Sequence, residues 1–150
     1  MDTIRCEVVT VEREIFSDDV NEVLAPGVWG QLGILPKHAP LITSLSVGEL
    51  IIRREGLEDE SIAIHGGFME VRENKVTVLA DTAERAEDID IARAEAAREQ
   101  AESMLKESAS EEDFERARAA LRRASLRLTV AKRRRRWPRE APQRPTAQGE

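Results

Sequence analysis

The feature that most constrains the fold of this chain is a single change of hydrophobic period near Asp81. Before this residue, apolar and polar side chains alternate with a period of two in short runs, and turn-forming residues separate the runs. After it, Ala, Glu and Arg dominate and the apolar residues are spaced three and four apart. Because the first spacing is that of strands and the second that of helices, the sequence predicts a mixed fold with β structure first and α structure second.

Residues 1–84 predict an antiparallel β-sandwich. The expected strands are residues 4–11, 20–24, 34–35, 41–45, 50–52, 61–64, 68–71 and 75–80. The expected turns are Asp18-Asp19, Pro26-Gly27, Gly48, Glu55-Gly56, Gly66-Gly67 and the tight hairpin turn Glu73-Asn74. Many short strands with no helical period between them are typical of a sandwich or a barrel. Since aromatic residues make up only 3% of the chain, the core must be built from Val, Ile, Leu and Ala.

Residues 85–136 predict an antiparallel two-helix hairpin. Asp88 and Asp90 are candidate N-caps for a first helix that runs from Ile89 to about Lys106. A break at residues 108–110 precedes a second helix, for which Ser110 and Asp113 resemble a capping box. The expected seam consists of Ala94, Ala97, Ala101, Met104 and Leu105 on the first helix and Phe114, Ala117, Leu121, Ala124, Leu128 and Ala131 on the second. Alanine buries little area, so such a hairpin can separate and repack.

The charge is distributed unevenly along the chain. Residues 1–84 carry 7 basic and 16 acidic side chains (−9), residues 85–132 carry 10 and 11 (−1), and residues 133–150 carry 6 and 2 (+4). Trp137-Pro138 should end the second helix, and residues 137–150 are expected to be disordered. The arginines at 133–136 could bind nucleic acid or acidic lipid, but the acidic body favours a solvated helix end or an acidic protein surface.

Several kinds of chemistry are not expected from this sequence. It contains no Walker loop, and neither histidine flanks a plausible nucleophile. Cys6 is the single cysteine, so it can form no internal disulfide and has no companion for a metal site. No apolar run reaches the length of a membrane span. We therefore expect no catalytic residues, no metal and no required cofactor, and any membrane association should go through a partner.

Residues 30–41 predict a rigid apolar corner. Gly30 and Gly33 permit unusual backbone torsions, while Pro36 and Pro40 fix φ and remove donors. The segment should therefore be extended, turn sharply, and extend again, with His38 on the corner. Two interpretations remain open at this point, a β-arch that only connects two strands and a surface that presents side chains to a partner.

The order of the motifs is specific. Gly-x-Leu-Gly-Ile-x-Pro-x-His-Ala-Pro-Leu from Gly30, Gly-Gly-Phe-Met-Glu-Val from Gly66 and Val-Thr-Val-Leu-Ala-Asp-Thr-Ala from Val76 precede the alanine-rich hairpin. Over residues 1–132 this arrangement closely resembles the epsilon subunit of bacterial F-type ATP synthases. The resemblance implies a non-catalytic subunit of the central stalk, peripheral at the cytoplasmic face of the cell membrane. It also implies that the sandwich binds the gamma subunit and touches the c-ring. The hairpin would lie on the sandwich, or extend to the alpha and beta subunits and inhibit ATP hydrolysis.

The resemblance also assigns contact residues. Those expected to face the c-ring or gamma are Gln31, Leu32, His38, Ala39, Pro40 and Leu41. Many relatives carry an acidic residue where this chain has Gln31, which favours a neutral hydrogen bond here. The expected inhibitory basic cluster consists of Arg122, Arg123, Arg133, Arg134, Arg135 and Arg136.

ATP is the one small ligand that the resemblance implies, as a regulatory ligand that favours the folded hairpin. The segment from Ile89 to Ala94 matches the Ile/Leu-Asp-x-x-Arg-Ala motif of ATP-binding relatives. The full expected set is Glu84, Ile89, Asp90, Arg93, Ala94, Arg123 and Arg127. Gln100 replaces a further arginine of those relatives. The structural alternative is an ordinary pairing of Asp90 with Arg93 within the helix.

A second class of function is a free-standing adaptor or nucleic-acid-binding module that uses the basic hairpin. It predicts an independent and strongly salt-dependent association with nucleic acid. The stalk subunit predicts co-purification with gamma and c subunits and no nucleic acid.

Overall fold

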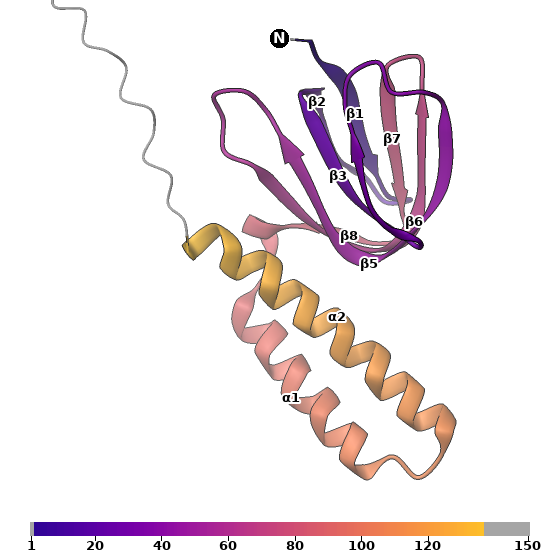
Figure 1. Cartoon of the computed structure of the whole chain (residues 1–150). Helices are drawn as coiled ribbons and strands as arrows, with labels where there is room; N and C mark the ends of the chain where they lie inside the picture. Colours follow the sequence, from indigo (N-terminus) through magenta and orange to yellow (C-terminus); the bar gives the residue numbers. More distant parts are fainter. Residues whose placement is uncertain (1, 137–150) are drawn as a thin grey trace, which may run out of the picture.

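The structure is a computed structural model that describes residues 2–136, in which a β-sandwich is followed by a helical hairpin (Figure 1). The strands are β1 (Ile4–Val9), β2 (Glu14–Val20), β3 (Glu22–Gly27), β4 (Gly30–Ile34), β5 (Leu41–Arg53), β6 (Glu60–Arg72), β7 (Lys75–Ala80) and β8 (Ala83–Arg85). A short 3-10 helix, η1 (Ala86–Asp88), leads to α1 (Ile91–Glu107) and α2 (Glu111–Arg136). The predicted fold class is confirmed. The predicted disordered tail, residues 137–150, lies outside the described residues.

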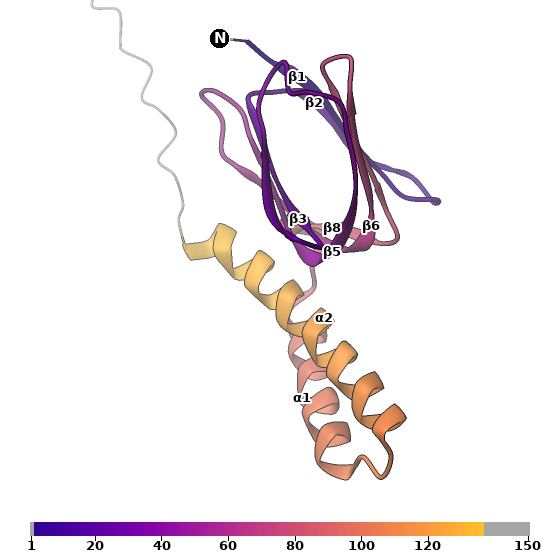
Figure 2. The same ribbon diagram turned by 45° about the vertical axis from the view of Figure 1, so that its right-hand side comes forward.

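One sheet supplies both layers of the sandwich. Its strand order is β2-β1-β7-β6-β5-β3-β4, and β8 pairs with residues 62–64 of β6 on the side opposite β5. The strands β5 and β6 are each 13 residues long and run through the bend that folds the sheet over on itself (Figure 2). The pairing of β1 with β7 is parallel, which differs from the all-antiparallel expectation.

The turns predicted at Gly48 and Gly66-Gly67 are wrong. These glycines lie inside β5 and β6, so each pair of short predicted strands merges into one long strand. A side chain at Gly48 would collide with the ring of Pro26, and one at Gly67 would collide with the backbone of Leu79. Glycine here permits close approach between neighbouring backbones, which sequence alone does not separate from a turn.

The turn predicted at Asp18-Asp19 is also wrong, because both residues lie in β2. Asp18 pairs with Arg54 at 2.8 Å, and Asp19 pairs with Arg5 at 3.4 Å. The ion pair with Arg5 on β1 and the ion pair with Arg54, which follows β5, compensate the acidic residues within the strand. Pro26-Gly27 likewise ends β3 rather than forming the turn.

The hairpin between β6 and β7 is confirmed. Glu73 and Asn74 have φ of 50° and 58°, as the tight turn requires. Met69 lies opposite Val78 and Val71 opposite Val76, and all four side chains are buried.

The main core lies entirely within the sandwich. Its fully buried large side chains are Ile4, Val8, Val20, Val23, Ile34, Leu50, Ile52, Ile62, Ile64, Met69, Val71 and Val76. No residue of this core cluster, as described, comes from the helices. The sandwich therefore holds its own core.

The helices begin at the predicted caps. The Asp90 carboxylate accepts from the backbone N–H of Arg93 at 3.1 Å, so α1 starts at Ile91 rather than Ile89. The hydroxyl of Ser110 accepts from the backbone N–H of Asp113 at 3.1 Å. Six of the predicted seam residues are buried as predicted, namely Ala94, Ala101, Ala117, Ala124, Leu128 and Ala131. The predicted burial of Met104 and Phe114 is wrong, because they lie toward the far end of the hairpin, where less covers them.

Candidate regulatory site between the sandwich and the hairpin

A small apolar cluster holds the hairpin against the sandwich. It consists of Ala63, Ala86, Ile89, Ala94, Leu128, Val130 and Ala131, with Ile91 and Leu126 packed beside it. Most of these side chains are small, so the cluster buries little apolar area. Val130 is fully buried, although it lies outside the predicted seam. Few residues form this second apolar face of α2, so no hydrophobic period marks it in the sequence.

Among the side chains that the structure describes, two ion pairs join α2 to the sandwich. Nε of Arg127 lies 2.8 Å from Oε1 of Glu84 on β8, and its Nη2 lies 3.0 Å from Oε2 of the same carboxylate. Nη2 of Arg133 lies 2.9 Å from Oε2 of Glu49 on β5. The side chain of Glu49 is only 12% exposed, so the second pair is also partly shielded from water. The docked hairpin therefore depends on charge as well as on apolar contact.

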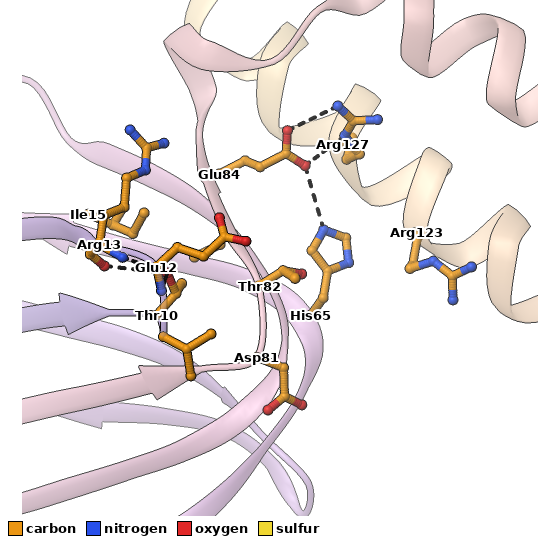
Figure 3. A pocket seen from close by; sticks show the side chains of 12 residues that line it. Thr10, Glu12, Arg13, Ile15, His65, Asp81, Thr82, Glu84, Arg123 and Arg127 are labelled. Carbon is orange, nitrogen blue, oxygen red and sulfur yellow. Dashed lines mark hydrogen bonds and ion pairs between the residues drawn. The ribbon is translucent and has the colours of Figure 1, made fainter.

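A cleft of about 440 Å³ lies between the sandwich and α2. Figure 3 shows its lining, which carries both signs of charge. The lining residues are Thr10, Val11, Glu12, Arg13, Ile15, His65, Asp81, Thr82, Ala83, Glu84, Arg123 and Arg127. A second crevice of about 210 Å³ lies between the two helices and is lined by Ala97, Gln100, Ala101, Met104, Ala120, Arg123, Ala124 and Arg127. Arg123 and Arg127 line both.

The structure brings together three of the seven residues predicted to bind ATP. Glu84, Arg123 and Arg127 line the cleft. Asp90 caps α1 through the Arg93 backbone, while Ile89 and Ala94 pack in the apolar cluster. Arg93 is exposed and lines neither the cleft nor the crevice. Because Glu84 already pairs with Arg127, an anion entering the cleft has to compete with that carboxylate.

The corner at residues 30–41 is held by its backbone. Lys37 has φ of 66°, and its N–H donates to the side chain of Asn74 at 2.8 Å. The N–H of His38 donates to the carbonyl of Leu35 at 3.2 Å. Of the predicted contact residues, Gln31, Ala39 and Pro40 are exposed, His38 is half-buried, and Leu32 and Leu41 pack against the core.

An exposed tryptophan beside Gln31 was missed. The side chain of Trp29 is 97% exposed in the turn between β3 and β4, and its neighbour Val28 is 50% exposed. The sequence contains a signal for this exposure, because Trp29 lies between Gly27 and Gly30, which favour a turn. Together with Gln31 it forms an apolar and polar tip on the sandwich.

The predicted basic cluster is partly engaged by the sandwich. Arg122 is exposed, Arg123 lines the cleft, and Arg133 pairs with Glu49. The residues Arg134, Arg135 and Arg136 form the end of α2, and their predicted contacts lie outside the described side chains.

The pKa of His65, which lines the cleft, is lowered from its ordinary value. Burial of the ring is the main cause; the carboxylate of Glu84 opposes it, and the cations Arg123 and Arg127 lower the pKa further.

Family models match both halves of the chain. The model described as ATP synthase, Delta/Epsilon chain, beta-sandwich domain matches residues 3–86. The model described as ATP synthase, Delta/Epsilon chain, long alpha-helix domain matches residues 87–132. The chain therefore belongs to the family of ATP synthase delta/epsilon chains.

Within the delta/epsilon family, the individual relatives are epsilon chains. The ATP synthase epsilon chain of Herpetosiphon aurantiacus is 54% identical over 132 residues, which cover 88% of this chain and 96% of the relative. The ATP synthase epsilon chain of Pelotomaculum thermopropionicum is 59% identical over 103 residues, covering 69% and 76% of the two chains. The resemblance to the epsilon subunit of bacterial F-type ATP synthases is confirmed.

Solved structures support the fold. A chain in the Euglena gracilis mitochondrial ATP synthase, solved with OSCP, F1 and c-ring, has a TM-score of 0.73 at 23% identity, with 83% of this chain and 78% of that chain covered. A chain in the central stalk and c-ring of the Tetrahymena thermophila mitochondrial ATP synthase has a TM-score of 0.60 at 14% identity, with 87% and 97% covered. Within residues 2–136, neither helix is long and apolar enough to cross a membrane.

Proposed function

We propose that the chain is a non-catalytic subunit of the central stalk that couples the rotor to the c-ring and inhibits ATP hydrolysis through its hairpin. The observation that carries this proposal is the weak attachment of the hairpin, which rests on a cluster of small side chains and two ion pairs. A switch needs an element with two packings of similar free energy. The sandwich, which has its own core, supplies the rigid body from which such an element can leave.

The sandwich corner and the tip formed by Trp29 and Gln31 are the surfaces proposed to contact gamma and the c-ring. Gln31, Ala39 and Pro40 are exposed on a backbone fixed by proline and hydrogen bonds. Trp29 adds a large apolar side chain beside Gln31. Rigid placement of contact residues lowers the entropy lost on binding, which suits a part that transmits torque.

Release of the hairpin would free positive charge. Docked, Arg127 is held by Glu84 and Arg133 by Glu49. In the extended state both arginines, with Arg123, would be free to pair with acidic residues of the alpha and beta subunits. Since Arg127 and Arg133 are held by carboxylates of the sandwich, we favour this role over a nucleic-acid-binding module.

We further propose ATP as a regulatory ligand of the docked state. Arg123 and Arg127 supply charge for the phosphates, and Asp90 and Arg93 at the start of α1 are proposed to face the base. Because Gln100 cannot supply the charge found in ATP-binding relatives, the affinity should be weaker than theirs by about 1–2 kcal/mol. Calorimetry on the full chain tests this: binding should be lost in both Arg93→Ala and Arg127→Ala, and binding that survives both places the nucleotide elsewhere.

The proposed location is the cytoplasmic face of the cell membrane, where the chain is held peripherally through the complex. Association with gamma and c subunits in solubilised membranes tests this assignment, and their absence from the purified material would contradict it.

Inhibition is tested by reconstituting the ATP synthase with the full chain or with a chain that ends at residue 85. Truncation should raise ATP hydrolysis and change synthesis less. The double variant Glu49→Gln with Glu84→Gln should act in the opposite direction, because it releases the hairpin while keeping its arginines. Arg118→Ala, at an exposed position on α2, is the control that should leave hydrolysis unchanged. Hydrolysis that truncation does not alter would contradict the inhibitory role.

A further inference from the structure

His65 lies at the junction where α2 meets the sandwich. Its side chain comes from β6 and is only 9% exposed. Nε2 lies 3.9 Å from Oε1 of Glu84, and Nδ1 is buried without a hydrogen-bond partner in the part of the chain that the structure describes. A buried imidazole nitrogen without a partner marks a group whose proton the fold has not stabilised.

The charges around His65 come from four elements (Figure 3). Arg123 and Arg127 face the cleft from α2, and Glu84 faces it from β8. The turn before β8 contributes Asp81, and the turn between β1 and β2 contributes Glu12 and Arg13.

In the docked state the carboxylate of Glu84, the one in contact with His65, is already paired with Arg127. Arg127 binds both oxygens of Glu84, at 2.8 and 3.0 Å. A protonated His65 would place a further cation beside Arg127 and Arg123, with Glu84 as the shared partner. Docking therefore favours the neutral imidazole.

Undocking reverses this balance. Arg123 and Arg127 leave with α2, whereas Glu84, Asp81, Glu12 and Arg13 stay with the sandwich because they belong to it. Glu84 is then free to pair with an imidazolium, and the ring regains water on the side that α2 covered. The undocked state therefore binds a proton at His65 more tightly than the docked state.

We propose that His65 is a proton-sensitive latch: its neutral form keeps the hairpin docked, and its protonation releases it. The latch uses only residues of this chain and needs no ligand. Its effect on hydrolysis in the assembled enzyme rests on the proposed function, whereas its effect on docking does not.

The pKa of His65 in the docked state is lowered, first by burial and also by Arg123 and Arg127. A histidine with the lower pKa in the docked state contributes docking stability above the undocked pKa. This contribution is lost as the pH falls through the undocked pKa toward the docked one. The docking equilibrium constant should therefore fall with acidification below the ordinary histidine range near 6.5, by at most about tenfold per pH unit.

The test measures docking in the isolated full chain. Spin labels on Glu58→Cys and Ala109→Cys, exposed positions on the sandwich and on the loop between the helices, report the distance between the two parts by electron spin resonance. Cys6 will not take a label, because it is buried and burial raises the pKa of its thiol to about 12. The docked fraction should fall between pH 8 and pH 5.5.

The chain offers matched controls. His65→Gln should make the docked fraction independent of pH over this range, while His38→Gln, which removes the other histidine, should leave the pH dependence intact. Glu49→Gln should weaken docking by the same factor at every pH, because the pair it breaks contains no histidine.

Direct titration of His65 by NMR in the unlabelled chain keeps the proposal testable if His65→Gln fails to dock. A pKa of His65 below 6.5 supports the latch, and a pKa at or above 6.5 overturns it. Docking that strengthens on acidification, or a pH dependence that persists in His65→Gln, also overturns it. These outcomes leave the stalk assignment intact, since that is tested by hydrolysis of the truncated complex.

Discussion

Two glycines, Gly67 and Gly30, adopt nearly the same backbone torsion in different surroundings. Their φ values are 129° and 127°, in the region where other residues are strained. A side chain at Gly67 would run into the backbone of Leu79 and Ala80, whereas one at Gly30 would meet open space. At Gly67 the requirement for glycine is therefore both torsional and steric.

We expect substitution by alanine to lower the free energy of unfolding by different amounts at Gly30 and at Gly67. Gly30→Ala should lose about 1 kcal/mol of unfolding free energy from backbone strain alone. Gly67→Ala should lose about 2–4 kcal/mol, because β6 and β7 must also move apart. Urea unfolding of each variant measures the difference. Equal losses would show that close approach does not matter at Gly67.

At the scale of the element, Asp90 at the start of α1 is a candidate for two roles, a helix cap and a ligand contact. The Asp90 carboxylate accepts from the Arg93 N–H and so caps the helix. The resemblance to ATP-binding relatives gives the same carboxylate to a nucleotide. A cap needs a side-chain oxygen, whereas a ligand contact that depends on charge needs the carboxylate.

Two substitutions at Asp90 separate these roles. Asp90→Asn should leave amide exchange at Arg93 unchanged, because asparagine caps as well as aspartate. Asp90→Ala should speed that exchange about fivefold, which corresponds to roughly 1 kcal/mol of capping energy. Hydrogen exchange read by NMR makes the measurement. ATP binding that is weakened in Asp90→Asn would assign the carboxylate to the ligand; fast exchange in Asp90→Asn would contradict the cap.

At the scale of the whole molecule, the sandwich is a stable domain to which the hairpin is loosely attached. The core cluster of the sandwich runs from Ile4 to Ala83 and takes no residue from the helices in the described chain. Among the described side chains, the hairpin is attached through a cluster of mostly small apolar residues and two ion pairs. Partly exposed ion pairs each stabilise an attachment by about 1 kcal/mol or less. The hairpin can therefore separate from the sandwich without unfolding it.

A chain that ends at residue 85 should therefore unfold cooperatively on heating, with a loss of no more than about 2 kcal/mol in stability. Ile62→Ala in that truncated chain is the comparison, because it removes a fully buried core side chain and should cost about 2–5 kcal/mol. Calorimetry measures both. A truncated chain without a cooperative transition would show that the hairpin completes the fold.

Local sequence patterns were sufficient to predict the order of β and α structure, the turn at Glu73-Asn74, the caps at Asp90 and Ser110, and much of the alanine seam. These features depend on local torsions and on periodicity, which neighbouring residues define. The family motifs are local in the same sense. For this reason the family assignment from sequence agreed with the comparisons.

The three-dimensional fold was needed to show which glycines lie inside strands, that β1 pairs with β7 in parallel, and that Arg127 and Arg133 are held by the sandwich. It also placed His65 and Glu84 beside Arg123 and Arg127, which lie roughly forty to sixty residues further along the chain. Such contacts depend on how distant segments approach in space. No local pattern encodes them, because the same glycine or arginine is compatible with a turn or a strand, and with solvent or a carboxylate.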